Sequence, residues 1–180
     1  MVAFSGGKDS QVVLDLVAKT LSSEQYFCVF TDTGMELPCT YDTLEETNND
    51  YKQKYKGFNI ERAESEESAI TQWEKYGPPS RFNRWCCSVR KTALFTRTMK
   101  KILKTDKQPK CVVYEGVRSD ESNRRKKYSR IAPGVKHINI LNARPILNWG
   151  NTEIYLYIIK NNIQINRGYR EGLTRIGCNI

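Results

Sequence analysis

Short apolar segments alternate along this chain with longer stretches in which apolar residues recur every three or four positions. The short segments predict strands at residues 2–4, 26–31, 58–61, 110–114 and 136–141. The first long stretch begins near Gln11 and predicts a helix whose apolar face carries Val12, Val13, Leu16, Val17 and Leu21. Strands that alternate with helices favour parallel βαβ units with right-handed crossovers. We therefore expect an α/β fold: a three-layer sandwich with helices on both faces of a mostly parallel sheet of about five strands.

Capping and helix-breaking residues delimit the other helices. Pro38 opens the second helix, and Ser65 with Glu66 and Glu67 starts a third that Gly77 ends. Residues 81–91 lead into a basic amphipathic helix whose apolar positions are Val89, Phe95, Met99, Ile102 and Leu103. A last helix starts at residues 151–153.

Single residues within these elements, and two stretches outside regular structure, also carry predictions. We expect Trp73, Cys28 and Cys111 in the core and the only histidine, His137, on the surface. The polar, basic stretch 119–130 predicts a mobile loop, and the tail 166–178 has no pattern of regular structure.

The composition is that of an ordinary globular domain. The 180 residues are 39% hydrophobic and 27% charged, which suits one domain with its own core. No segment approaches the roughly 18 apolar residues that a membrane span needs, and the N-terminus has no signal-peptide pattern. We therefore expect a cytoplasmic protein without membrane contact. Since the first strand starts at Val2 and the chain stops two residues after a cysteine, we expect residues 1–180 to be one domain of a longer protein.

The net charge of +9 indicates an anionic partner. A nucleotide, a nucleic acid or an acidic protein would each satisfy it, and charge does not choose among them. The sequence leaves the oligomeric state open.

The hexapeptide SGGKDS at residues 5–10 joins the first predicted strand to the first predicted helix. Adjacent glycines let the backbone turn sharply, and the amides at a helix N-terminus favour phosphate oxygens. Lys8 adds a positive charge, and the Ser5 and Ser10 hydroxyls add hydrogen bonds. A Walker loop has four residues between its first glycine and its Gly-Lys pair, so this is a different phosphate loop.

Charged residues follow two other predicted strands. Asp32 and Glu36 come after the second strand, and Arg118 comes after the fourth. Ligands of open α/β sheets bind beyond the carboxyl ends of the strands, which places these side chains near a nucleotide. Arginines hold phosphates in bidentate geometry, so Arg118 and then Arg124 or Arg125 are candidate phosphate ligands.

SGGKDS resembles the pyrophosphate loop of the PP-loop ATP pyrophosphatases, which cleave ATP between its α and β phosphates. The resemblance extends to Asp32-Thr33-Gly34, RWCCSVRK, EGVRSDESNRR and RPILNW, which occur in the order found in the phosphoadenosine phosphosulfate (PAPS) reductase family. It covers nearly the whole chain and implies the fold of the adenine nucleotide α-hydrolases.

The resemblance implies an enzyme that binds ATP with Mg²⁺ and breaks it at the α-phosphorus. Lys8, Asp9 and Arg118 are the implied catalytic residues. The nucleotide ligands are Ser5, Gly6, Gly7, Lys8, Ser10, Asp32, Arg118 and Arg124. An intact loop favours ATP, because sulfonucleotide reductases often have a degenerate one.

The cysteines point towards the reductases instead. Cys86-Cys87 with the later Cys178 resembles the CC…CxxC arrangement of iron–sulfur adenylylsulfate (APS) reductases. A cluster usually takes four thiolates, so the fourth ligand would follow Ile180. Zinc, or unligated thiols, are the alternatives.

Three functions therefore stay open. The first is ATP cleavage in sulfur metabolism or sulfur transfer, with a sulfur donor protein or reductant as partner. The second is an iron–sulfur APS or PAPS reductase. The third is a subunit for nucleic-acid sulfur modification, such as a DNA phosphorothioation ATP pyrophosphatase, in which basic residues hold the nucleic acid.

Overall fold

The computed structural model describes residues 1–80, 82–107, 109–134 and 139–177. The strands are β1 (Val2–Phe4), β2 (Cys28–Thr31), β3 (Ile60–Ala63), β4 (Cys111–Glu115), β5 (Ile131–Pro133) and β6 (Ile140–Ala143). The helices are α1 (Lys8–Thr20), α2 (Pro38–Lys54), α3 (Ala69–Tyr76), α4 (Leu94–Ile102) and α5 (Asn151–Lys160). A π-helical turn, η1 (Cys87–Ala93), leads into α4. Three 3₁₀ turns are η2 (Ser119–Glu121), η3 (Arg125–Lys127) and η4 (Arg167–Tyr169).

The strands form one six-stranded sheet in the order β3-β2-β1-β4-β6-β5. All neighbours are parallel except β5 and β6, which pair antiparallel. The α/β fold with a mostly parallel sheet is thus confirmed. The chain leaves β1 towards β2 on one side and returns to β4 on the other, so the order reverses at β1. Such a switch point is where open α/β sheets bind ligands.

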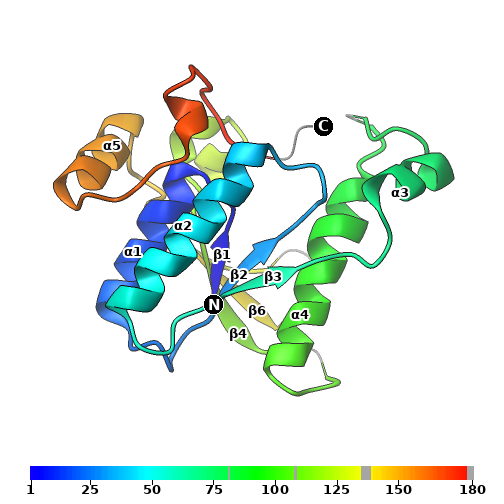
Figure 1. Cartoon of the computed structure of the whole chain (residues 1–180), viewed down its shortest axis with the longest axis horizontal. Helices are drawn as coiled ribbons and strands as arrows, with labels where there is room; N and C mark the ends of the chain where they lie inside the picture. Colours follow the sequence, from blue (N-terminus) through cyan, green and yellow to red (C-terminus); the bar gives the residue numbers. More distant parts are fainter. Residues whose placement is uncertain (81, 108, 135–138, 178–180) are drawn as a thin grey trace.

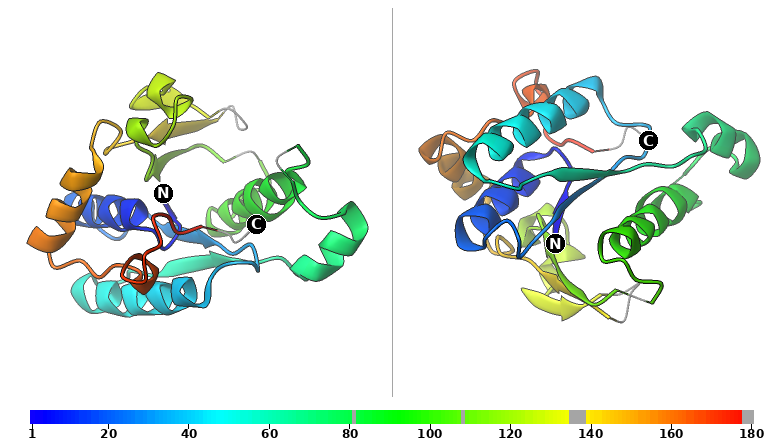
Figure 2. Two further views of the ribbon diagram at one scale, coloured as in Figure 1. Left: turned by 90° about the horizontal axis from the view of Figure 1, so that it is seen from above. Right: turned by 60° about the horizontal axis from the view of Figure 1, so that its bottom comes forward.

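Helices cover both faces of the sheet, which gives three layers (Figure 1 and Figure 2). Val2, Phe4, Cys28 and Phe30 face α1, α2 and α5 in the larger core cluster. The alternate residues Ala3 and Val29 belong to the second cluster, with Leu94 and Met99 of α4. This period of two is that of strands buried on both faces.

The observed strands differ in detail from the predicted ones. The sheet has six strands in place of about five, because β5 pairs with β6 as an antiparallel edge strand. β3 begins at Ile60 and not at Phe58, because the Phe58 amide donates to the Tyr55 carbonyl in a turn, while its ring packs in the core. The last strand, predicted at 136–141, is β6; residues 135–138, His137 among them, lie outside the described part.

The third helix also differs from its prediction. It starts at Ala69, because the Ser68 hydroxyl accepts a hydrogen bond from the Thr71 amide and caps it; Ser65 does not cap it. Trp73 is 41% exposed, so its core assignment was wrong. Cys28 is fully buried as expected, whereas Cys111 is only partly buried.

The polar stretch 119–130 contains the turns η2 and η3, and the tail contains η4, where no regular structure was expected. Among the described residues, no helix is both long enough and apolar enough to cross a bilayer.

Candidate functional site

The SGGKDS hexapeptide forms a tight loop between β1 and α1. Gly6 has φ +71°, and a Cβ there would lie 2.9 Å from Thr40 Cγ2 of α2, so both the conformation and the close approach require glycine. Gly7 is the N-cap of α1. Within the described residues, the Gly6 and Gly7 amides have no hydrogen-bond acceptor. Two free amides beside the N-terminus of a 13-residue helix are suited to bind an anion.

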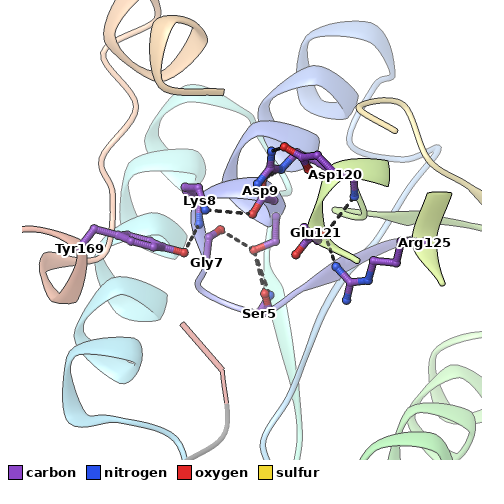
Figure 3. Close-up of polar contacts among 10 residues, drawn as sticks. Ser5, Gly7, Lys8, Asp9, Asp120, Glu121, Arg125 and Tyr169 are labelled. Atoms are coloured by element: carbon purple, nitrogen blue, oxygen red, sulfur yellow. Dashed lines mark hydrogen bonds and ion pairs between the residues drawn. The ribbon is translucent and has the colours of Figure 1, made fainter. Parts of the chain in front are cut away.

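The Ser10 hydroxyl makes hydrogen bonds to backbone groups of this loop. It donates to the Gly7 carbonyl at 2.8 Å and accepts from the Ser5 amide at 3.2 Å (Figure 3). The Ser5 hydroxyl contacts Ser10 Oγ at 3.2 Å, but the Ser5 side chain is exposed. Ser10 therefore shapes the loop, while Ser5 is accessible to a ligand.

Lys8 is 5% exposed and contacts a residue from the tail. Its backbone amide donates to the Tyr169 hydroxyl at 3.1 Å, and its ammonium lies 5.1 Å from the Tyr169 ring centroid. Its Nζ lies 3.5 Å from Asp9 Oδ2. The lysine charge is thus held at the start of α1, largely shielded from solvent.

Arg118 ties the end of β4 to the loop. It is 5% exposed, and its Nε lies 2.7 Å from Asp9 Oδ1, an ion pair whose N–H is not aligned for a hydrogen bond. Its Nη1 donates to Asp120 Oδ2 at 2.6 Å. The two predicted catalytic side chains Asp9 and Arg118 therefore touch each other. Arg118 holds Asp9 in place, and its phosphate contact stays a prediction.

Glu121 extends this network to Arg125 (Figure 3). It accepts from the Arg118 amide at 3.0 Å and pairs with the Arg125 guanidinium. Burial alone would raise the pKa of Glu121, but the Arg118 amide and the charge of Arg125 outweigh burial and lower it. The carboxylate is therefore ionised and fixes the turn η2 beside the loop.

Gly116 sets how closely β4 approaches the loop. A Cβ on Gly116 would lie 2.8 Å from Asp9 C and 2.8 Å from Ser10 N, both backbone atoms. No pattern in the sequence points to Gly116, because only the folded contact shows that a side chain would not fit.

Asp32 lies at the end of β2, but its carboxylate is already bonded. It accepts from the Gly34 amide at 2.7 Å, the Tyr41 hydroxyl at 2.9 Å and Arg62 Nε at 2.9 Å. The turn after Asp32 is also fixed by the buried Arg90 side chain, which donates to the Thr33 carbonyl at 2.6 Å. Asp32 thus shapes this turn, and its contact with a nucleotide stays a prediction.

A cavity of about 700 Å³ opens at the carboxyl ends of β1, β2 and β4. Its lining contains both apolar and basic side chains. The apolar ones include Phe4, Phe30, Phe95, Val113 and Ile140, and the basic ones include Lys91, Arg124, Arg125, Lys127 and Arg144. Ser5 also lines it, so the cavity and the loop are continuous. Of the two acidic residues predicted after β2, its described wall contains Glu36 and not Asp32.

Arg144 and Tyr128 form a part of this wall that the sequence analysis missed. The Arg144 guanidinium stacks 4.6 Å from the Tyr128 ring centroid, and its Nε donates to Glu115 Oε2 at 3.0 Å. Burial raises the pKa of Glu115, although Arg144 opposes that rise. Burial likewise raises the pKa of Glu36, against the Thr33 hydroxyl and Lys91.

The SGGKDS loop thus lies at the switch point of the sheet, and comparisons with known proteins identify the family. The sequence model of the family described as "Phosphoadenosine phosphosulfate reductase domain" matches residues 1–180. The chain belongs to the PAPS reductase domain family.

Relatives of this PAPS reductase domain include an uncharacterized protein of Methanocaldococcus jannaschii, 34% identical over 99% of the chain, and the adenosine 5'-phosphosulfate reductase 2 of Bacillus subtilis, 27% identical over 99% of the chain. The chain covers 70% of the Bacillus protein. It spans 35% and 39% of the length of two Methanocaldococcus relatives.

Solved structures with the same fold include the PAPS reductase of Candida auris, with a TM-score of 0.67, 22% identity, and coverage of 98% of this chain and 81% of that one. The FMN adenylyltransferase of Candida glabrata, in complex with FAD and inorganic pyrophosphate, has a TM-score of 0.67, 19% identity, and coverage of 98% and 54%. The U34-tRNA thiolase of Methanococcus maripaludis with its 4Fe-4S cluster has a TM-score of 0.56, 13% identity, and coverage of 91% and 57%. The PP-loop fold expected from SGGKDS is confirmed.

The predicted metal ligands are placed only in part. Cys86 is buried just before η1, and the partly buried Cys87 begins it. Cys178 lies outside the described residues, so the structure does not test the predicted group of three. Among the residues that it does describe, no three His, Cys, Asp or Glu side chains are grouped to hold a metal ion.

Proposed function

We propose that this PAPS reductase domain binds ATP, or a related adenine nucleotide, and cleaves it at the α-phosphate with release of pyrophosphate. The observation that supports this most is the pair of Gly6 and Gly7 amides at the N-terminus of α1, which have no acceptor among the described residues. Backbone amides in this position bind phosphate oxygens and stabilise charge that develops there.

The reaction requires stabilisation of the leaving pyrophosphate. An oxygen of a second substrate, or of water, attacks the α-phosphorus, and the bond between that phosphorus and the bridging α–β oxygen breaks. The electron pair of that bond stays with the departing pyrophosphate. The Gly6 and Gly7 amides, the Ser5 hydroxyl and the Lys8 charge are the groups that we assign to its oxygens.

Mg²⁺, which prefers oxygen ligands and usually binds substrate phosphates with one or two carboxylates, would neutralise phosphate charge here. Asp9 and Asp120 carry carboxylates of that type beside the loop. Both also contact Arg118, which fixes their position.

The cavity next to the loop is our proposed site for the nucleoside and the second substrate. Its volume of about 700 Å³ lies within the range of roughly 300–1,000 Å³ that is typical of ligand sites. Its apolar side chains suit a base, and Arg124 and Arg125 suit an anionic group.

We assign the reaction to sulfur metabolism or sulfur transfer, with a sulfur donor protein or a reductant as partner. The names of the relatives support this assignment, because they include APS reductases from several bacteria. The same names favour a second candidate, an iron–sulfur reductase of APS or PAPS, for which Cys86 and Cys87 would supply two of the thiolates.

A pyrophosphate-release assay tests the first proposal. The full chain is incubated with ATP, Mg²⁺ and candidate sulfur donors, beside Lys8→Ala and the control Lys54→Ala. Lys54 is an exposed lysine of α2 that pairs with Asp50 and lies over the Tyr51 ring, away from the loop. We expect release from the wild type and Lys54→Ala but not from Lys8→Ala. Sulfite from APS or PAPS, without pyrophosphate from ATP, would instead establish the reductase.

A further inference from the structure

Tyr169 brings the tail of the chain onto the phosphate loop, 161 residues away in sequence. It ends the turn η4, and its side chain points from that turn towards Lys8 and Gly7 (Figure 3). The Lys8 amide donates to its hydroxyl at 3.1 Å. A phenol thus lies at the helix N-terminus where the proposed function puts a phosphate oxygen.

The position of Tyr169 is fixed by its own turn. Asn166 is fully buried; its Nδ2 donates to the Cys39 carbonyl at 3.2 Å, and its Oδ1 accepts from the Gly168 amide at 2.9 Å. The same Asn166 amide contacts Thr40 Oγ1 at 3.4 Å, and Thr40 is the residue that packs against Gly6. The turn and the phosphate loop therefore rest on the same residues at the start of α2.

The Tyr169 hydroxyl is able to donate a hydrogen bond at neutral pH. Burial raises the pKa of Tyr169 to about 12, partly offset by backbone hydrogen bonds from Lys8 and Ile176, so the phenol stays protonated. Its oxygen accepts from the Lys8 amide, and within the described part of the chain its proton has no acceptor. Tyr169 is partly buried, and a hydroxyl whose proton has no acceptor among the described residues is free to donate to a ligand.

The hydroxyls of Tyr169 and Ser5 converge on the same side of Gly7. The point where a Cβ of Gly7 would stand is 3.3 Å from Tyr169 Oη and 3.6 Å from Ser5 Oγ. Both hydroxyls therefore lie beside Gly7, whose amide has no acceptor among the described residues.

We infer that Tyr169 is a further ligand of the anion at this loop: its hydroxyl donates to an oxygen of the diphosphate while it accepts from the Lys8 amide. This inference rests on the proposed function, because it assigns one more contact to the same phosphate site. It adds a residue of the tail to a site otherwise built from the first ten residues and the end of β4. Tyr169 binds the leaving group rather than covering the loop.

The test is the binding of inorganic pyrophosphate to the full chain, measured by isothermal titration calorimetry. Tyr169→Phe keeps the ring over Lys8 and removes only the hydroxyl. Tyr155→Phe is the control, because the Tyr155 ring also lies near Lys8 Nζ, at 6.0 Å, and its hydroxyl makes no hydrogen bond among the described residues. A hydrogen bond to a charged group corresponds to roughly a 10- to 100-fold change in Kd. We expect that loss for Tyr169→Phe and a change of about 2-fold or less for Tyr155→Phe.

Adenosine binding and thermal unfolding separate a ligand contact from a structural one. Loss of a ligand contact weakens pyrophosphate binding and leaves adenosine binding unchanged, whereas a damaged site weakens both. Unchanged or tighter pyrophosphate binding by a folded Tyr169→Phe protein overturns the inference, the tighter case showing that Tyr169 competes with the anion. If the wild type binds no pyrophosphate, the inference and the proposed function both fail. If Tyr169→Phe weakens pyrophosphate binding but the wild type does not cleave ATP, the inference stands and the proposed reaction fails.

Discussion

The contact between Gly116 and the start of α1 allows a substitution whose effect follows from the structure. In Gly116→Ala the added Cβ would lie 2.8 Å from Asp9 C, 2.8 Å from Ser10 N and 3.0 Å from Asp9 O. All three are backbone atoms of a helical turn, so relief requires β4 or α1 to move. Overpacking of this kind costs roughly 1–3 kcal/mol of stability.

The same shift displaces the phosphate loop, because Ser10 is bonded to the Gly7 carbonyl and the Ser5 amide. A displacement of about 1 Å in a positioned site can cost about 100-fold in activity. We therefore predict that Gly116→Ala is less stable by about 1–3 kcal/mol and releases pyrophosphate from ATP at least about 10-fold more slowly.

Urea unfolding measures the first effect and a coupled pyrophosphate assay the second. Gly177→Ala is the matched control for stability, since a Cβ there would meet none of the described residues within 4 Å; its unfolding free energy should change by less than about 0.5 kcal/mol. A Gly116→Ala protein with wild-type stability and wild-type activity would refute the argument that this contact positions the loop.

Three further predictions concern residues around the site. Arg90 donates to Gln72 Oε1, the Thr33 carbonyl and the Glu67 carbonyl. Arg90→Met should therefore lower the unfolding free energy, measured in urea, by roughly 3 kcal/mol. Replacement of the exposed Arg97 by Met is the control and should change it by less than about 0.5 kcal/mol. The pKa of Glu36 is raised above its ordinary 4.5, so the folded state holds the carboxyl proton more tightly than the unfolded state does, and stability falls as pH rises above 4.5. Glu36→Gln should remove this fall in unfolding curves measured at a series of pH values. An unchanged pH dependence would contradict the prediction. If the exposed residues Lys126 and Lys127 hold a nucleic acid, replacing both by Ala should reduce the slope of log binding constant against log salt concentration by about 2. A protein that binds no DNA or RNA would exclude the nucleic-acid alternative.

The parts of the fold that sequence predicted well are those set by local patterns. The apolar run before SGGKDS and the helical periodicity after it identify β1, the loop and α1, since each depends on neighbours in sequence. The edge strand β5 has no such pattern: it is three residues long, ends in Pro133 and exists because β6 pairs with it. Trp73 was misplaced because helical periodicity does not say whether another element covers that helix face.

The candidate site divides in the same way. SGGKDS could be recognised because its anion-binding groups are predicted to be its own backbone amides, and Arg118 because it follows a strand. The contacts of Gly116 and Tyr169 are with residues 100 or more positions away in sequence, so no local pattern shows them. Asp32 was selected by its place after β2, but its neighbours Tyr41 and Arg62 use its carboxylate, and the sequence does not show that pairing. Topology predicts which residues reach the site, and only the folded contacts show which side chains remain available.

The most direct test of the account is to observe the loop amides while pyrophosphate binds. In ¹⁵N-labelled protein, titration with inorganic pyrophosphate should shift the Gly6 and Gly7 amide resonances in a saturable manner, and the Gly57 amide, which lies in the turn between α2 and β3, should not move. If pyrophosphate saturates the protein and the Gly6 and Gly7 resonances do not shift, the central claim that these amides hold the leaving group is wrong.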